Sequence, residues 1–158
     1  MAQLPKLASH VRTRIDNANR LSKQLLGVAG LGVPEHHPDD VHVFWRYALR
    51  VDPAVVPGGP VALANKLKFY DIAAAPRYVN KPAFRCKIFA DQVTFGSSRW
   101  PFTLARPEAV DYDADRFPGT YAGLDHVLVF PWNEKMTSEH MDFLAASIIE
   151  AVGELVGG

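Results

Sequence analysis

The sequence predicts an α/β fold of the two-layer (α+β) type, in which a small, mainly antiparallel sheet of about three strands has helices packed on one face. Amphipathic patterns typical of helices occupy both ends of the chain, and a segment with strict apolar alternation, typical of a strand, lies between them. The 158 residues, 48% hydrophobic and 22% charged, have the length and composition of one globular domain. We therefore expect residues 1–158 to form a single domain.

The first long helix is predicted over residues 4–26, within an N-terminal segment 1–26. Its apolar residues recur every three or four positions, which gives one apolar stripe: Leu4, Leu7, Val11, Ile15, Ala18, Leu21 and Leu25. Pro5 is tolerated in a first turn, and Gly27 and Gly30 provide a stop.

Residues 31–40 are rich in turn-forming residues and are expected to be a loop. The strand that follows, residues 41–51, has one apolar face: Val41, Val43, Trp45, Tyr47, Leu49 and Val51. Pro60 is well placed to begin a helix that runs to about Tyr70, and residues 72–79 are expected to form a short strand.

The second half of the chain begins with a long segment, residues 80–117, that has many helix and strand breakers and little periodicity. A long irregular segment inside a domain is usually functional. Residues 118–123 are expected to form one helical turn and residues 126–130 a buried strand. Thr137 can cap a last helix that has Glu139 in its first turn and an apolar stripe up to Leu155.

Charge and composition exclude several classes of function. The 17 basic and 17 acidic residues cancel, so the chain has neither the positive charge expected of a nucleic-acid-binding protein nor a polybasic membrane patch. No apolar run reaches the ~18 residues of a membrane span, and the charged first 25 residues do not form a secretory signal. The single cysteine, Cys86, rules out an internal disulfide. We expect a cytoplasmic protein that binds no nucleic acid and no membrane.

Motifs for common cofactors and metals are weak. The sequence contains neither a P-loop nor a dinucleotide-binding G-x-G-x-x-G. A run of acidic and imidazole side chains is better explained as a solvated loop than as a metal site: Glu35, His36, His37, Asp39, Asp40 and His42. Cys86 is expected to be a packing residue and His140 a packing or capping residue.

Cations and aromatic residues concentrate in and just before the irregular segment: Arg77, Tyr78, Asn80, Lys81, Arg85, Lys87, Arg99, Trp100 and Arg106. Such side chains suit the recognition of carboxylates, phosphates or sugars. Ordinary decoration of a surface loop remains the alternative.

Several of these segments, in this order, carry a family resemblance. They are QLPKL at the start of the first helix, strand 42–51, residues 72–78 followed by KPAF, and the end of the chain from VLVFPWNE to TSEHMDF. In this order and spacing, the chain resembles the C-terminal small domain of the pyridoxal-phosphate-dependent sugar aminotransferases of the DegT/DnrJ/StrS type, which have fold type I.

The resemblance implies a division of labour between two domains. In this family a large domain supplies the Schiff-base lysine and the groups that hold pyridoxal phosphate, and the first helix seen here bridges from that domain. No lysine here occupies the Schiff-base motif, so we expect no catalytic and no cofactor-binding residue in this chain alone, with pyridoxal phosphate belonging to the complete enzyme. The large domain or subunit is the expected partner, and homo-oligomerisation is left open.

The resemblance also implies substrate contacts. Tyr78 matches the tyrosine of the family's R-x-H-Y stretch, whereas Arg77 stands in place of its histidine and Ala75 in place of its arginine. The tract 93–102 is expected to define the substrate or the subgroup. The candidate substrate-binding residues are Arg77, Tyr78, Asn80, Lys81, Arg99 and Trp100.

Three functions follow from this reading. The first is a C-terminal domain or portion of an aminotransferase that acts on a nucleotide-linked keto sugar or a keto cyclitol and is inactive without a large domain. The alternatives are a non-catalytic partner of a full-length aminotransferase and a stand-alone module that binds a small anionic metabolite. An uncovered apolar stripe on the first helix would indicate a missing partner surface.

Overall fold

The computed structural model describes residues 3–158, so the first two residues of the predicted 1–26 segment lie outside the described part. The chain divides into two compact units. The first unit contains the residues up to Tyr78 together with Asp125–Gly158, and the second contains Val79–Leu124.

The first unit is built on a four-stranded sheet of β1 (Leu31–Gly32), β2 (Arg46–Val51), β3 (Ala75–Pro76) and β4 (Val127–Pro131). The strand order is β1-β2-β4-β3, and every neighbouring pair is antiparallel. This agrees with the predicted small antiparallel sheet. It adds one strand, because β1 lies in the segment that was expected to be a loop.

Two strands are shorter than predicted. The strand expected over 41–51 begins only at Arg46, because Phe44 has a positive φ of 49° that interrupts the extended chain. Phe44 is buried while Val41 and Val43 are exposed, the reverse of the predicted alternation. The strand expected over 72–79 is reduced to Ala75–Pro76, since Arg77 also has a φ of 49°.

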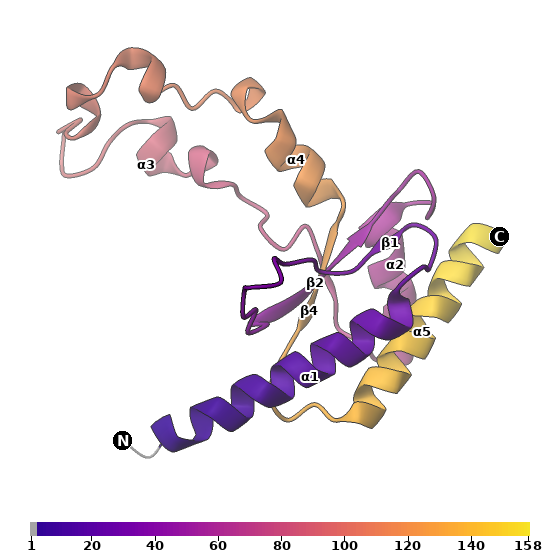
Figure 1. Cartoon of the computed structure of the whole chain (residues 1–158). Helices are drawn as coiled ribbons and strands as arrows, with labels where there is room; N and C mark the ends of the chain where they lie inside the picture. Colours follow the sequence, from indigo (N-terminus) through magenta and orange to yellow (C-terminus); the bar gives the residue numbers. More distant parts are fainter. Residues whose placement is uncertain (1–2) are drawn as a thin grey trace. The chain divides into compact units, whose positions relative to one another are not determined.

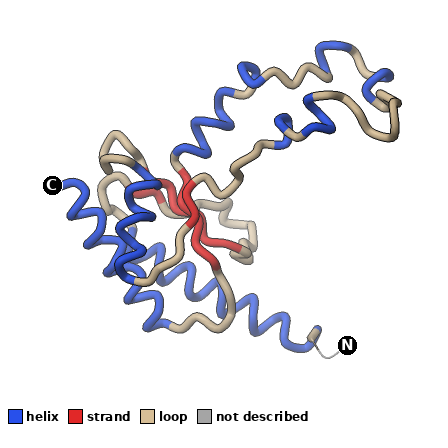
Figure 2. The backbone as a smooth tube through the Cα atoms, turned by 180° about the vertical axis from the view of Figure 1, so that it is seen from behind, coloured by secondary structure: helices blue, strands red, loops and turns tan. Residues whose placement is uncertain are grey.

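Three helices cover one face of the sheet: α1 (Leu7–Leu25), α2 (Gly59–Leu67) and α5 (Ser138–Gly157). Short 3-10 turns extend α1 backwards (Leu4–Lys6) and α2 forwards (Lys68–Tyr70), so both helices match their predicted ranges. Helix α5 packs against both α1 and α2 (Figure 1). Figure 2 shows the same helices gathered beside the strands in the view from behind.

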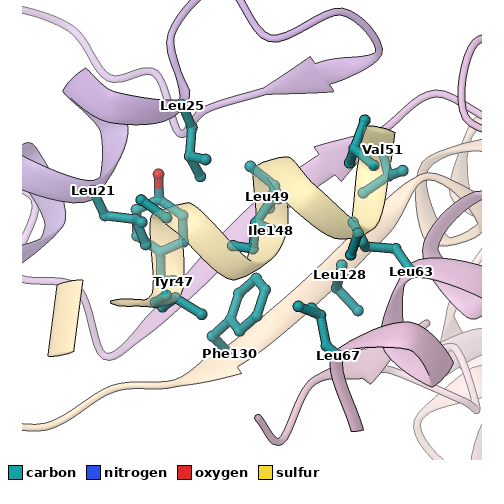
Figure 3. Close-up of a cluster of buried hydrophobic side chains, with 14 of the residues drawn as sticks. Leu21, Leu25, Tyr47, Leu49, Val51, Leu63, Leu67, Leu128, Phe130 and Ile148 are labelled. Carbon is teal, nitrogen blue, oxygen red and sulfur yellow. The ribbon is translucent and has the colours of Figure 1, made fainter. Parts of the chain in front are cut away.

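The core lies between these helices and the sheet (Figure 3). The inward-facing side chains of β2 are Tyr47, Leu49 and Val51, and all three are fully buried. The alternate side chains Ala48 and Arg50 are exposed, so the opposite face of the sheet is not covered along this strand. The remaining core side chains labelled in Figure 3 are Leu21, Leu25, Leu63, Leu67, Leu128, Phe130 and Ile148.

Polar contacts fix α1 against α5 and the segment that precedes it. Arg20 donates two hydrogen bonds to Asp142, of 2.8 and 2.6 Å, and Arg14 pairs with Glu134 at 2.8 Å. The buried Asn17 amide donates to the carbonyl of Met136 at 2.7 Å. These contacts set the crossing of two helices that are far apart in the sequence.

Helix α5 begins with a capping box. The Thr137 hydroxyl accepts a hydrogen bond from the backbone N–H of His140, and His140 Nδ1 accepts one from the backbone N–H of Thr137. This arrangement satisfies two backbone donors at the helix start. Both Thr137 and His140 therefore act as caps, as the sequence predicted for Thr137 and allowed for His140.

The second unit contains short helical pieces where the sequence indicated an irregular segment. They are α3 (Lys87–Ala90) and four 3-10 turns within 83–116. The helical turn predicted over residues 118–123 is present as α4 (Pro118–Asp125), most of which belongs to this unit. The second unit is held together by contacts between aromatic rings. Phe84 stacks on Phe117 with ring centroids 4.4 Å apart. A second group contains Phe89, Phe102 and Tyr112.

Across residues 3–158, none of the helices combines the length and the apolar character that crossing a membrane requires.

Candidate functional site

The two candidate residues of the first unit lie where β3 ends. The backbone N–H of Arg77 donates to the carbonyl of Val127 at 3.1 Å, and the positive φ of Arg77 turns the chain out of the strand. The Arg77 side chain forms an ion pair with Asp125, with Nε and Oδ1 3.3 Å apart. The charge of Arg77 is thus already matched by a carboxylate of the same unit.

Tyr78 contacts a cation, Arg46, that is not among the candidate residues predicted from the sequence. The Arg46 guanidinium carbon lies 5.6 Å from the centre of the Tyr78 ring and 5.2 Å from that of the Trp45 ring. The two rings are 6.4 Å apart in an edge-on arrangement. We call these three residues the Trp45–Arg46–Tyr78 cluster; its cation–π contacts hold the Tyr78 ring beside the first residue of β2.

Arg46 is half-buried, and its Nε atom is buried without a hydrogen-bond partner in the described part of the chain. Because Arg46 precedes the inward-facing Tyr47 along β2, it projects from the face of the sheet that the three helices do not cover. The tripeptide WRY at the start of a strand could have signalled this cluster. The tripeptide could not indicate, however, that the third member of the cluster is Tyr78, which is far away in the sequence.

The other four candidates belong to the second unit, and all of them are exposed: Asn80, Lys81, Arg99 and Trp100. Arg99 donates a hydrogen bond to the Gln92 side-chain oxygen. The Trp100 backbone N–H bonds to Ser98 Oγ at 3.1 Å, and Thr94 donates to the Trp100 carbonyl. The tract 93–102 is therefore held by its own local hydrogen bonds, with the Arg99 and Trp100 side chains at the surface.

Two hollows in the structure lie away from most of these residues. A groove of about 550 Å³ in the first unit runs between the end of β4 and the start of α5. Its walls are mainly apolar, including Ile72, Phe130 and Leu144, with Asp71 and Lys135 among its polar residues. In the second unit, a hollow of about 360 Å³ includes Arg99. No other candidate lines either hollow.

The acidic and imidazole residues before β2 do not converge. His37 and Asp39 approach to 3.6 Å, and His36 stacks on His42 with centroids 6.0 Å apart. Among residues 3–158, no group of three or more His, Cys, Asp or Glu side chains is arranged to hold a metal ion.

The lysines of this chain do not fit a pyridoxal-phosphate site. A Schiff-base lysine needs an enclosed position in which its amine can be held against the cofactor. Lys66 is half-buried and pairs with Glu154 at 2.7 Å, and the other lysines in residues 3–158 are exposed. No chemical step through the cofactor is therefore assigned to this chain.

Comparison with known proteins identifies the class. A sequence model of the DegT/DnrJ/EryC1/StrS aminotransferase family matches residues 1–149, which is nearly the whole chain. The chain therefore belongs to this aminotransferase family. No curated protein sequence matches it.

Solved structures share the fold at low sequence identity. The chain is similar to the aminotransferase TlmJ from Streptoalloteichus hindustanus, with a TM-score of 0.65 and 18% identity over 98% of this chain and 35% of that one. It is also similar to the sugar aminotransferase CalS13 from Micromonospora echinospora, with a TM-score of 0.64 and 19% identity over 94% and 32% of the two chains.

A third similar structure is a DegT DnrJ EryC1 StrS aminotransferase from Brucella abortus, with a TM-score of 0.66 and 16% identity over 99% and 34% of the two chains. The chain thus spans about a third of the length of these solved structures. At these identities the comparison establishes a shared fold.

Proposed function

We propose that this chain is the C-terminal small domain, or a separate C-terminal portion, of a sugar aminotransferase, and that it completes an active site together with a large cofactor-binding domain. One observation carries the proposal. The family match runs along residues 1–149, yet the chain corresponds to only about a third of each similar structure.

The exposed apolar edge of the first helix supports a partner surface. Leu21 and Leu25 near the end of α1 are fully buried, but Leu4 and Leu7 are 67% and 56% exposed. All four belong to the same apolar stripe, so the stripe runs from the core out onto an uncovered surface. We assign the Leu4–Leu7 end of this stripe to contact with the large domain.

In the complete enzyme, pyridoxal phosphate bound by the large domain supplies the electron sink that amino transfer needs. This chain would contribute to the substrate side of the site. Tyr78 is the strongest candidate, because its ring is held by Arg46 and its position matches a family tyrosine. Arg77, Asn80, Lys81, Arg99 and Trp100 remain proposed contacts. The proposed substrate is a nucleotide-linked keto sugar or a keto cyclitol.

The test is reconstitution with a large domain from a family aminotransferase of the same organism. The proposal predicts a stable complex that transfers amino groups, while neither part does so alone. The double variant Leu4→Glu, Leu7→Glu should abolish complex formation, whereas Val61→Glu, at an exposed apolar site on α2, should leave it intact. A failure of every family large domain of that organism to bind would contradict the proposal.

One observation favours a second candidate, a non-catalytic partner of a full-length aminotransferase. The family's R-x-H-Y stretch reads Ala75, Pro76, Arg77, Tyr78 here, and Arg77 is paired with Asp125. A chain of this kind would form the complex but add no amino-transfer activity to it, so the same reconstitution distinguishes the two candidates.

A further inference from the structure

Most arginines near the surface of this protein already have an anionic partner. Ion pairs join Arg14 to Glu134, Arg20 to Asp142, Arg50 to Asp52, Arg77 to Asp125, Arg106 to Glu108 and Arg116 to Asp111. Arg12 and Arg85 are exposed, and water can solvate them. Arg46 differs from both groups, because it is half-buried and, within residues 3–158, its side chain forms no ion pair and its buried Nε has no hydrogen-bond partner.

Burying part of a guanidinium without a carboxylate is costly, since the charge loses water and gains no partner. The faces of Trp45 and Tyr78 offset part of this cost through cation–π contacts at 5.2 and 5.6 Å. They also place the buried Nε–H beside aromatic rings. The rings supply no oxygen acceptor, however, so the planar nitrogen fork of Arg46 still lacks the bidentate partner that it suits best.

We propose that the Trp45–Arg46–Tyr78 cluster is a binding site for a small oxyanion, either a phosphate or a carboxylate group of a ligand. The two rings hold the guanidinium in a fixed orientation on the uncovered face of the sheet, and its terminal nitrogens donate to the oxyanion. Trp45 is 65% exposed, so its ring also offers an apolar surface to the part of the ligand next to the anion. All three residues belong to the first unit.

This inference does not depend on the proposed aminotransferase function, because the site is complete in the chain alone. Arg77, which precedes Tyr78 in the chain, is less suited to binding this oxyanion. Arg77 already contacts Asp125, whereas the Arg46 side chain forms no ion pair with a carboxylate among residues 3–158.

The experiment is a titration of the 158-residue chain with inorganic phosphate and, separately, with acetate, at constant ionic strength set by sodium chloride. The NMR signals of the Arg46 side-chain Nε–H and of the Tyr78 ring report binding. We expect saturable shifts with at least one of the two anions. The anion with the lower Kd shows whether the site prefers a phosphate or a carboxylate.

Variants decide whether the binding belongs to Arg46. Arg46→Gln should raise the Kd by about tenfold or more, equivalent to about 1.4 kcal/mol. The matched control is Arg50→Gln on the same strand and face, whose arginine is paired with Asp52 at 3.7 Å; it should change the Kd by less than about twofold. If the backbone amide NMR signals of Arg46→Gln show that this variant does not fold, Arg46→Lys serves as the second variant. Lysine keeps the charge but not the planar fork and should still weaken binding severalfold.

Non-saturable shifts with both anions, or equal losses in the Arg46 and Arg50 variants, would overturn the site. Because the titration uses no large domain, its failure leaves the proposed enzyme function untouched. A failed reconstitution likewise leaves the oxyanion site untouched.

Discussion

Tyr47 is the residue whose chemistry depends most on the fold. Its side chain is fully buried, and its hydroxyl lies 2.9 Å from that of Ser22. Burial disfavours the charged phenolate and raises the pKa of Tyr47 to about 12, although the hydrogen bond to Ser22 opposes the shift.

This shift predicts a loss of stability in alkaline solution. Between pH 10 and 12 the unfolded chain releases the Tyr47 proton while the folded chain keeps it, so folding stability falls as the pH rises. From these two pKa values the loss at pH 11 is about 1.4 kcal/mol. Urea unfolding of wild type and Tyr47→Phe at pH 8 and pH 11 measures it. From pH 8 to pH 11 the free energy of unfolding of wild type should fall by this amount relative to that of Tyr47→Phe. A difference between the two proteins that stays the same at both pH values would contradict the raised pKa.

The candidate site shows how far single residues could be read from the sequence. The motif comparison selected Tyr78, and the structure places its ring in a cation–aromatic cluster. Arg46 was missed because its significance comes from Tyr78, which lies across the sheet in space and 32 positions away in the sequence. The pairing of Arg77 with Asp125 was missed for the same reason. Local patterns select residue types, but tertiary contacts decide which charges are neutralised.

At the scale of elements, the start of α5 depends on its capping box. Thr137→Ala removes the hydroxyl that accepts the backbone N–H of His140 and should cost about 1 kcal/mol. Thr137→Ser keeps a hydroxyl and should cost much less. Urea unfolding at neutral pH compares the two variants; equal losses would mean that the methyl group, rather than the cap, matters at this position.

The contact between α1 and α5 predicts an acid-sensitive interaction. The hydrogen bonds from Arg20, together with that from Gln24, lower the pKa of Asp142 below its usual range. A lowered pKa contributes stability above the ordinary carboxyl range, and this contribution is lost as the pH falls through the folded pKa. Asp142→Asn should therefore be less stable than wild type at pH 7, with the difference shrinking in acid.

Asp16→Asn is the control, since it changes an exposed carboxylate on α1, the helix that Asp142 contacts through Arg20. This variant should be as stable as wild type at pH 7, and its difference in stability from wild type should not change in acid. If the two variants behave alike over the whole pH range, Asp142 is not what couples the helices.

Long elements were predictable, whereas short strands were not. The helices α1, α2 and α5 lie where the apolar spacing and the cap residues placed them, because each buries one continuous stripe. The strand expected over 41–51 begins only at Arg46, because the positive φ of Phe44 interrupts the extended chain after Val41 and Val43. The two-residue strands β1 and β3 are defined by their partners β2 and β4, which no local pattern could reveal.

At the scale of the whole molecule, the two units do not share their main core. Every residue of the principal hydrophobic cluster lies outside 79–124. Replacing residues 79–124 with a short Gly/Ser linker should therefore leave a first unit that unfolds cooperatively in urea. Circular dichroism tests this, with the intact chain as the reference. Loss of cooperative unfolding would show that the second unit is required for the fold of the first.

The uncovered end of α1 connects the fold to its proposed partner. Leu21→Ala empties a fully buried position and should cost the isolated chain about 3 kcal/mol. The double variant Leu4→Glu, Leu7→Glu should cost the isolated chain little, because both side chains are exposed. Urea unfolding of the chain alone separates the two effects. A large loss in the double variant would mean that this end of α1 supports the fold rather than a partner.

The proposed function requires that this chain complete an aminotransferase together with a large domain. The most direct measurement is the rate of amino transfer by a matching large domain loaded with pyridoxal phosphate, with and without this chain at saturating concentration. We expect transfer only when both parts are present, and loss of transfer when the Leu4→Glu, Leu7→Glu variant replaces the wild-type chain. A large domain that binds the chain tightly yet transfers amino groups at the same rate without it would contradict the claim.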